Sequence, residues 1–394
     1  MTLMSDSDVI IIGGGILGAS LAFELTKESI RVQLIDRSSV GREGSGATAG
    51  NLHIQAVHTR RPGQVIALDN VRLLPLQIAA SRLWDDAEQE LPEDIELRRT
   101  GGLTVAESEL QGEEILLKRR HEIEAGIPGE ILSSDEARRL LPELGDSVQL
   151  AEYCPLDGYV NPLKVTPAWM RAAIRQGLTL RTHDEVLNIS KVSSSWIVKT
   201  KNGQFTCSKL VIVAGPWMDD ILSMVGVSIR MNPVAIQMHI TERLVPRLPF
   251  LVQHIAEGMS IKQVSAGQIM IGGGWPAQYL ALGETSDISV ESMTGNLSQA
   301  VRILPFLQKV RLLRSWSGAL GATADEMPII GEVPGAEGLF VAGGTYAFTF
   351  APLWAKTLLN LILKRVPAVD VSDLGIGRLM NASGSQRAGD NRNG

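Results

Sequence analysis

Residues 8–36 restrict the fold of this chain more than any other part of its sequence. They read as a short apolar strand, a glycine-rich turn, a helix, and a second apolar strand that ends in an acid. Gly13, Gly15 and Gly18 have the spacing G-x-G-x-x-G, and Asp36 closes the second strand. This order is typical of a βαβ unit that binds a dinucleotide, whereas a turn that is merely rich in glycine would need neither the helix nor the acid.

Each residue of this motif has a physical task at a phosphate site. Gly13 permits a tight turn, Gly15 lets a pyrophosphate approach the backbone because it has no Cβ, and Gly18 lets the helix pack closely on the strand. The helix that begins near Ile16 offers unpaired N–H groups and the positive end of its dipole to phosphates. The carboxylate of Asp36 can accept hydrogen bonds from ribose hydroxyl groups, and it repels a 2′-phosphate.

The composition narrows the class of protein. The formal net charge of −6 gives no basic footprint for nucleic acid, so we expect no nucleic-acid partner. Cys154 and Cys207 are the only cysteines and form no C-x-x-C motif, which argues against a disulfide framework, a zinc ribbon and a redox dithiol; we expect no metal. The first strand begins by Asp8, which leaves no room for a signal peptide. We therefore expect a cytoplasmic protein whose membrane contact is at most peripheral.

Two later segments favour a flavin over a nicotinamide cofactor. Leu210–Trp217 reads as a buried strand that ends in small residues. Gly338–Gly344 reads as another strand, and a helix from about Pro352 to Arg365 follows it. A nicotinamide cofactor does not need this second strand–glycine–helix corner, whereas a flavin binds its adenine half at the first corner and extends its ring toward the second. The alternative is that Gly343 and Gly344 only cap a strand.

At this point the sequence resembles the D-amino-acid oxidase-like FAD oxidoreductases, which include glycine oxidase, sarcosine oxidase, D-amino-acid dehydrogenase and the FAD subunits of opine and hydroxyproline dehydrogenases. The resemblance rests on Val9–Gly18 with Arg31–Arg37, on Val213–Trp217, on the D-x-x-P-x-I-G pattern of Asp325–Gly331, and on Gly338–Gly344. It implies a hydride transfer from the carbon next to an amine to flavin N5, followed by hydrolysis of the imine. The electrons then pass to oxygen, to a quinone or to a companion electron-transfer subunit.

The resemblance also implies the architecture. We expect an α/β fold in which a doubly wound, Rossmann-like FAD-binding domain is interleaved with an α+β substrate domain that contains a large antiparallel sheet. The expected segments are 1–56, 145–228 and 315–370 for the FAD-binding domain, 57–144 and 229–314 for the substrate domain, and 381–394 for a disordered tail.

A set of FAD contacts follows from the motifs and the resemblance together. The expected contacts are Gly13, Gly15, Ile16, Gly18, Asp36, Arg37, Ser45, Gly46, Asn51, Leu52, Val186, Ala214, Gly215, Trp217, Gly318, Gly343, Gly344, Thr345, Tyr346, Ala347, Phe348 and Thr349. No His or Cys stands where relatives attach the flavin covalently, so we expect non-covalent FAD.

One departure from the family pattern bears on the substrate. Many amino-acid oxidases of this family hold the substrate carboxylate with an Arg in the segment W-x-G-x-R, and the matching residue here is Leu320. Leu cannot imitate the planar, bidentate guanidinium. We therefore expect an amine or amino-acid substrate, with a secondary or N-substituted amino acid favoured. The alternative is a catalytically weak, FAD-binding structural subunit of a heteromeric dehydrogenase.

Candidate catalytic residues follow the glycine-rich loop. The alternation of residues 51–56 predicts a strand on which Asn51, His53 and Gln55 share one face. We expect His53, Gln55 and Tyr346 to orient the substrate, while a hydrogen bond inside the core is the alternative for His53. Lys262, on a predicted strand at 259–264, is a weaker candidate.

Overall fold

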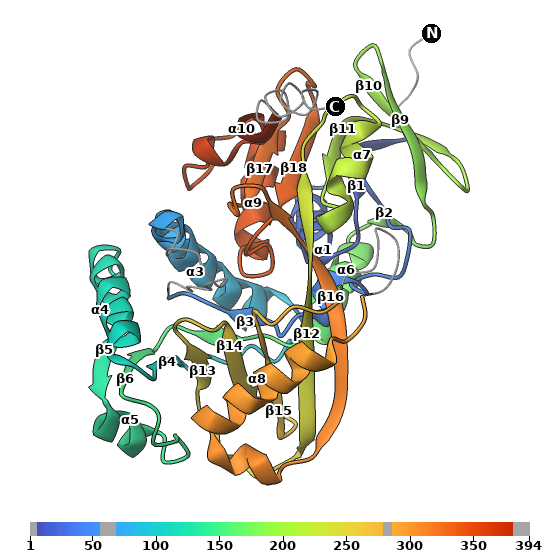
Figure 1. Ribbon diagram of the computed structural model, residues 1–394. Coiled ribbons are helices and arrows are strands. Elements are labelled where there is room, and N and C mark those ends of the chain that lie inside the picture. Colours follow the sequence, from blue (N-terminus) through green and yellow to red (C-terminus); the bar gives the residue numbers. More distant parts are fainter. Residues whose placement is uncertain (1–5, 56–67, 279–285, 381–394) are drawn as a thin grey trace, which may run out of the picture.

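The computed structural model describes residues 6–55, 68–278 and 286–380, and its strands form two eight-stranded sheets and one two-stranded sheet (Figure 1). The first large sheet contains the N-terminal strand of the chain. Its main path runs β17 (Ile329–Glu332), β18 (Leu339–Gly343), β11 (Gln204–Ile212), β1 (Ser7–Ile12), β2 (Val32–Ile35) and β8 (Thr179–Arg181), and the hairpin of β9 (Val186–Val192) and β10 (Ser195–Thr200) pairs with β11. β1 is parallel to both β2 and β11, and β18 is parallel to β11.

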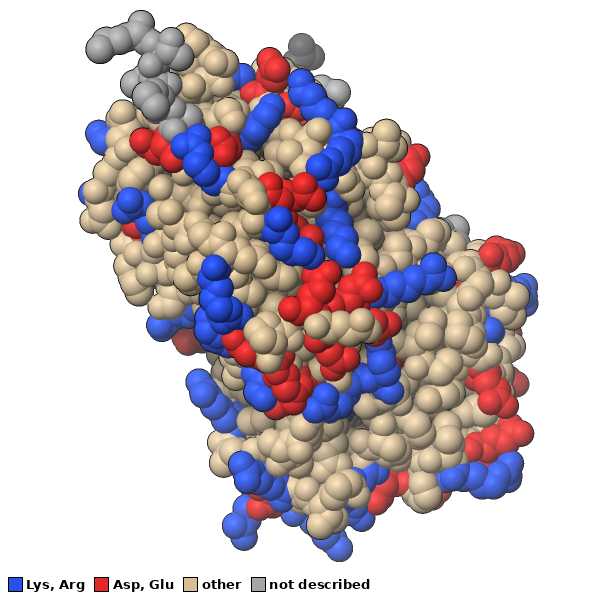
Figure 2. Space-filling model, turned by 180° about the vertical axis from the view of Figure 1, so that it is seen from behind, with Lys and Arg blue, Asp and Glu red and all other residues tan. Residues whose placement is uncertain are grey.

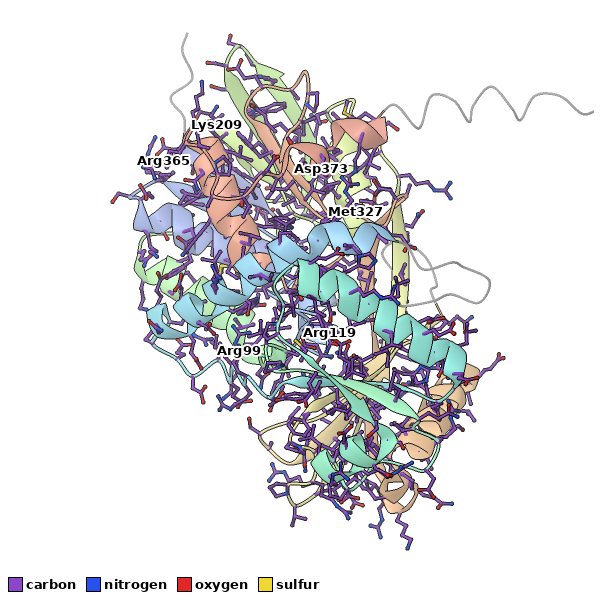
Figure 3. The ribbon with its side chains drawn as sticks, turned by 90° about the vertical axis from the view of Figure 1, so that its left-hand side faces the viewer. Arg99, Arg119, Lys209, Met327, Arg365 and Asp373 are labelled. Carbon is purple, nitrogen blue, oxygen red and sulfur yellow. The ribbon has the colours of Figure 1, made fainter. Side chains whose placement is uncertain are left out.

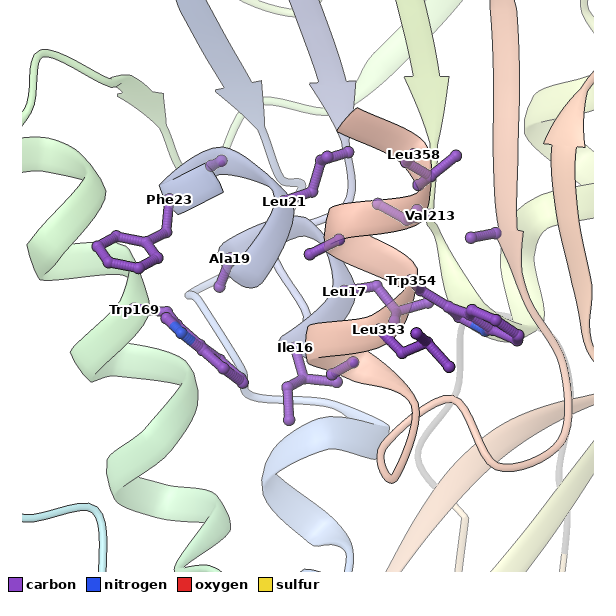
Figure 4. Packing of buried hydrophobic residues seen from close by; sticks show 14 of the residues in the cluster. Ile16, Leu17, Ala19, Leu21, Phe23, Trp169, Val213, Leu353, Trp354 and Leu358 are labelled. Carbon is purple, nitrogen blue, oxygen red and sulfur yellow. The ribbon is translucent and has the colours of Figure 1, made fainter. Parts of the chain in front are cut away.

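Helices cover both faces of this sheet because alternate residues of β1 point to opposite sides. Val9 and Ile11 belong to the core cluster that also contains α1 (Ile16–Lys27), α6 (Pro162–Arg175) and α9 (Ala351–Ile362). Ile10 and Ile12 pack instead toward α7 (Met218–Ser223). Figure 4 shows α1 between α6, which carries Trp169, and α9, which carries Trp354. The sheet is therefore doubly wound, as predicted.

The second large sheet is mostly antiparallel. Its strand order is β16 (Leu312–Thr323), β12 (Met231–Arg243), β15 (Gln268–Gly273), β14 (Met259–Gln263), β13 (Leu251–His254), β4 (Gly102–Ala106), β6 (Leu150–Cys154) and β5 (Glu130–Ser133). Among these described strands, only β13 and β4 form a parallel pair. The helices α8 (Val290–Ile303), α4 (Glu109–Glu124) and α5 (Ser134–Leu140) accompany this sheet, and α3 (Leu74–Glu90) packs against α9 of the first part. The predicted fold class, an α/β part interleaved with a part built on a large antiparallel sheet, is confirmed.

The faces of the second sheet follow from its register. Ile261, Ile269 and Ile271 point to one side, where they share a core with Ile303 of α8. The opposite side carries Trp316, whose Nε1–H donates to the carbonyl of a residue in α2 (Gly44–Ala47) at 2.9 Å. This second side therefore faces the first sheet.

Three sequence-based expectations need correction. The predicted strand 51–56 is too long, because β3 contains only Asn51–Leu52, which pairs with β7 (Gly158–Tyr159), and Asp157 binds the backbone beyond it. β6 lies within the segment 145–228 but pairs with β4 and β5 of the second sheet, so we propose a domain boundary after Cys154. The helix after Gly344 begins at Ala351 and ends at Ile362, before Arg365. The predicted tail 381–394 lies outside the described residues.

The described surface carries charges of both signs. On the face seen in Figure 2, acidic and basic side chains lie next to one another across the middle of the molecule. Among the described helices, none combines the length and the apolar character needed to cross a bilayer.

Candidate active site

The expected cofactor residues gather at one edge of the first sheet. β1, β2, β11 and β18 are parallel neighbours, so their carboxyl ends meet at the same edge. Gly13 follows β1, Asp36 follows β2, Gly215 follows β11, and Gly344 follows β18. Strand order changes direction at β1, because β2 lies on one side of it and β11 on the other. Open α/β sheets bind ligands at such a switch point.

The glycines of the first turn show the geometry that the motif requires. Gly13 has φ of 115°, and a Cβ on it would lie 2.5 Å from the carbonyl oxygen of Val213. A Cβ on Gly18 would lie 1.9 Å from the carbonyl oxygen of Gly13. The helix and the turn therefore leave no room for a side chain at this position. A Cβ on Gly15 would meet only the hydroxyl of Ser45, at 3.0 Å. The space beside Gly15 is therefore open, as a pyrophosphate site needs.

Polar groups surround this open space. The Ser45 hydroxyl, on α2 next to Gly46, accepts a hydrogen bond from the N–H of Ile16 at 2.9 Å, whereas Gly15, the N-cap of α1, makes no side-chain cap. The carboxylate of Asp36 accepts hydrogen bonds from the N–H groups of Gly14 and Ser38, at 2.6 and 2.7 Å. These bonds hold the acid at the end of β2, beside the glycine-rich turn.

An arginine and a tryptophan pack together at this edge. The guanidinium of Arg37 lies 4.0 Å from the ring centroid of Trp217, which follows Ala214 after β11. Val186, the first residue of β9, is buried close to the same edge, because the N–H of the nearby Asp184 donates to the carbonyl of Asp36. The expected contacts Arg37 and Trp217 thus touch one another, and Val186 lies near the end of β2.

The second glycine corner is held by aromatic packing. Gly344 has φ of 86°, and Tyr346 has φ of 59°. The ring of Phe348 stacks on Trp84 at 6.0 Å, and Trp84 donates its Nε1–H to the carbonyl of Thr349 at 2.8 Å. Burial raises the pKa of Tyr346, and the carboxylate of Glu326 raises it further. Thr345 and Ala347 complete this turn, which leads into α9.

A sequence profile of one protein family matches the chain over residues 8–361, under the description "FAD dependent oxidoreductase" (DAO). The chain belongs to the FAD-dependent oxidoreductase family. The resemblance to D-amino-acid oxidase-like proteins is thereby confirmed, and the cofactor is FAD. This chain is accordingly an enzyme of the FAD-dependent oxidoreductase class.

Individual relatives span nearly the whole chain. Glycine oxidase from Geobacillus kaustophilus is 29% identical over 378 residues, which cover 94% of this chain and 97% of that protein. A subunit of the opine oxidase from Rhizobium meliloti is 27% identical, with 83% of this chain and 85% of that protein covered. The crystal structure of the Geobacillus kaustophilus glycine oxidase superposes with a TM-score of 0.84 at 27% identity, over 94% of this chain and 98% of that one.

The described residues of this FAD-dependent oxidoreductase fit the cofactor. The open side of Gly15, the N-terminus of α1 and the fixed acid Asp36 suit a pyrophosphate and a ribose. We propose that these groups hold the adenosine diphosphate half and that the turn after Gly344 holds the flavin half. The individual contacts, and the non-covalent attachment, stay predictions.

The two sheets meet where α2 crosses β16. A Cβ on Gly318 would lie 2.3 Å from the Cβ of Ala47, and a Cβ on Gly44 would lie 2.5 Å from the carbonyl oxygen of Ala319. Leu320 lies two residues after Gly318 and therefore points to the same side of β16, toward the first sheet. The position that the sequence comparison with the family pattern assigns to an Arg is thus apolar here, and it lies on the side of β16 where Gly318 meets α2.

The predicted catalytic residues divide into two environments. Gln55 is fully buried: its Oε1 accepts from Thr104 and Lys118 at 2.7 and 2.8 Å, and its Nε2 donates to Asp157 at 2.6 Å. It is therefore satisfied within the protein, and we propose a positioning role for it in place of the predicted catalytic one. His53 differs, because its buried Nδ1 has no hydrogen-bond partner among the described residues.

Electrostatics keep the imidazole of His53 neutral. Burial lowers its pKa, the neighbouring Lys262 lowers it as well, and the carboxylate of Asp157 opposes them. Asp157 also accepts hydrogen bonds from the N–H groups of Ile54 and Gln55, at 2.8 and 3.2 Å, and so fixes the backbone next to His53. Sequence reasoning missed Asp157, because it is separated from these partners by about a hundred residues and no local pattern marks it.

One trio of described side chains has the composition of a metal site: Glu107, His254 and Glu257. Nδ1 of His254 accepts hydrogen bonds from the N–H groups of Ala256 and Glu257 at 3.1 and 3.0 Å, so the proton of a neutral ring sits on Nε2, 3.3 Å from Glu107. Arg302 donates to both oxygens of Glu107. We assign no metal to this trio, since its histidine offers no free lone pair.

Replacing Asp36 by Ala is expected to weaken FAD binding by about 1–3 kcal/mol, the range for losing hydrogen bonds of a charged group. The physical reason is that the ribose loses its acceptor and the turn loses the bond to Gly14. Fluorescence titration of apoprotein with FAD measures the dissociation constant. Asp8→Ala is the control, since Asp8 pairs with Arg31 at the opposite end of β1 and should leave that constant unchanged. An unaltered constant for Asp36→Ala would contradict the assignment.

Proposed function

We propose that this enzyme oxidises an amine or amino acid, with a secondary or N-substituted amino acid favoured. The observation that carries the proposal is the side of β16 that faces the cofactor edge, where Leu320 stands in the position of the family arginine. The relatives named for glycine and for opines support the amine class of substrate, since an opine is an N-substituted amino acid.

Bound FAD would supply the acceptor for a hydride from the carbon next to the substrate nitrogen, and the oxidised substrate would be an imine that water hydrolyses. The residues of this chain have to supply a neutral amine, a fixed orientation and a dry site. His53 suits the second task, because a neutral imidazole with an unpaired Nδ1 can accept a hydrogen bond from the amine N–H and so orient the nitrogen. Leu320 and Tyr346 offer apolar surface that excludes water and contacts the substituent on nitrogen.

A larger, N-substituted substrate is expected to react more efficiently than glycine. Glycine has almost no surface to bind once the arginine is missing, whereas an N-alkyl group buries apolar area worth about 25 cal/mol per Å². We expect kcat/KM to be at least about tenfold higher for an N-alkylated or secondary amino acid, which is about 1.4 kcal/mol in transition-state binding. Leu320→Arg should narrow this gap.

Anaerobic reduction of the bound flavin tests the proposal, with D-, L- and N-alkyl amino acids, opines and simple amines as reductants. Equal efficiency on glycine, or unaltered preferences in Leu320→Ala, would contradict the role of Leu320. Failure of every compound to bleach the flavin would favour the alternative, a structural FAD-binding subunit.

We further propose that companion subunits receive the electrons. The relative from Rhizobium meliloti is named as one subunit of its oxidase. Both cysteines of this chain are buried, and burial raises the pKa of Cys207 to about 12, so neither offers a ready thiolate for a metal cluster. Slow reoxidation of the reduced flavin by oxygen, with rapid reoxidation by an artificial acceptor, is the expected result.

A further inference from the structure

Lys262 occupies an unusual environment near the end of β14. Its side chain is only 3% exposed, yet no described carboxylate lies within ion-pair distance of it. The ammonium donates a hydrogen bond to the carbonyl of Ala49 and lies 4.3 Å from the ring centroid of Tyr159. Lys118, which is buried to the same degree, has Glu122 and Glu152 at 2.8 and 2.7 Å. The contrast marks Lys262 as a buried amino group without a carboxylate partner among the described side chains.

The register of the second sheet places Lys262 on the side that faces the cofactor edge. Lys262 pairs with Met270 of β15, which pairs with Ile240 of β12, which pairs with Arg314 of β16. Directly paired residues of antiparallel strands share one side of a sheet. Arg314 lies two residues before Trp316 and therefore shares its side as well. Lys262 and Leu320 consequently point to the same side of the sheet, from different strands.

Two polar side-chain atoms near Lys262 also lack a hydrogen-bond partner among the described residues. Asn51 donates to the hydroxyl of Ser260, two residues before Lys262, at 2.6 Å, but its buried Oδ1 accepts no hydrogen bond from the described residues. The buried Nδ1 of His53 likewise has no hydrogen-bond partner among the described residues. Burial lowers the pKa of Lys262 well below its ordinary value. A ligand that carries both an anionic group and an N–H donor would satisfy all three side chains, and an amino acid is such a ligand.

We propose that Lys262 binds the carboxylate of the substrate from β14, in place of the arginine that β16 lacks. The inference rests on the proposed function, since it assumes that the ligand is an amino acid. Asn51 and His53 then face the nitrogen end of the same molecule. An ammonium on a flexible stem binds a carboxylate as a point charge and tolerates a bulky nitrogen substituent, because it does not impose the planar geometry of a guanidinium.

Binding of a simple carboxylate to the FAD-loaded protein tests this inference without turnover. The probes are propionate and the neutral propionamide, titrated by calorimetry and by the change in flavin absorbance. Wild-type protein should bind propionate at least about 10-fold more tightly than propionamide, and Lys262→Met should lose about 10- to 100-fold in propionate affinity, the range for hydrogen bonds to a charged group. The propionamide affinity should not change.

Arg314→Met is the matched control, because it removes the same charge from the same side of the sheet at an exposed position. It should leave both affinities unchanged. If Lys262→Met does not retain FAD, Lys262→Gln, which keeps a donor for the Ala49 carbonyl, takes its place in the same titrations.

Three results would overturn the inference: equal affinity of wild-type protein for the two probes, a larger loss in Arg314→Met than in Lys262→Met, or a Lys262→Met protein with altered flavin absorbance but unaltered propionate affinity. The last result would assign Lys262 to the flavin. The proposed function fails separately, if no amine reduces the flavin while propionate binding still depends on Lys262.

Discussion

Gly15→Leu is expected to abolish FAD binding while the fold survives. The position of a Cβ on Gly15 has no described protein atom closer than the Ser45 hydroxyl at 3.0 Å, so the protein itself can accommodate a side chain there. A leucine would extend into the space in front of α1, where the pyrophosphate has to approach the backbone. We expect the dissociation constant for FAD to rise at least about 100-fold, or about 2.7 kcal/mol. The purified protein should be colourless.

Gly18→Ala provides the contrasting variant. Its Cβ would lie 1.9 Å from the carbonyl oxygen of Gly13, so the turn or the helix has to move, and the fold itself should be destabilised. Thermal unfolding of the two apoproteins separates the effects: Gly15→Leu should unfold close to wild type and Gly18→Ala well below it. A Gly15→Leu protein with a full complement of FAD would show that the pyrophosphate lies elsewhere.

Lys118→Met is expected to be the most destabilising single change in the second part of the chain. Lys118 is fully buried on α4, between Glu122 of the same helix and Glu152 of β6. Arg119 lies 3.7 Å from each acid. Figure 3 labels this arginine beside α4. Removing one partner of a buried ion pair costs about 3–5 kcal/mol, because the other partner stays buried without its counter-charge. Denaturant unfolding at pH 7 measures this loss.

The pH dependence of the free energy of unfolding provides a second test of this buried ion-pair cluster. Burial, together with a hydrogen bond to Glu122, raises the pKa of Glu152 to about 8. A raised pKa means that the folded protein binds the proton more tightly than the unfolded chain, so this contribution is present at acid pH and lost as the pH rises toward 8. Glu152→Gln should flatten the fall in stability between about pH 5 and 8. Wild-type stability in Lys118→Met, or an unchanged pH profile in Glu152→Gln, would contradict the account.

The first nucleotide corner could be predicted because its determinants are local. The turn at Gly13 and the close packing at Gly18 depend on residues within one βαβ unit, and the acid Asp36 follows the adjacent strand. The second corner could be predicted for the same reason, although its anchoring by Trp84 could not, since Trp84 lies 265 residues before Thr349.

The substrate side of the site was harder to predict from the sequence, because residues far apart in the chain determine it. Alternating polarity suggested that His53 and Gln55 lie on one strand, but Asp157 binds the backbone there and ends the regular pairing after Leu52. The pairing of Lys118 with Glu152, and the lack of a charge partner for Lys262 among the described residues, depend on which elements become neighbours. A single sequence does not reveal that pairing. The parallel pairing of β13 with β4 was equally hidden.

The interleaved order of the strands determines when the first sheet can form during synthesis. The Ser208 hydroxyl bonds to the carbonyl of Asp8, 200 residues earlier, and the Ser20 hydroxyl bonds to the carbonyl of Ala351, 331 residues later. The N-terminal βαβ unit therefore leaves the ribosome long before β11, β18 and α9 exist to cover it. β1 can pair with β2 early, but its other neighbour β11 and the covering helix α9 are made much later, so we expect the first sheet to be completed only late in synthesis.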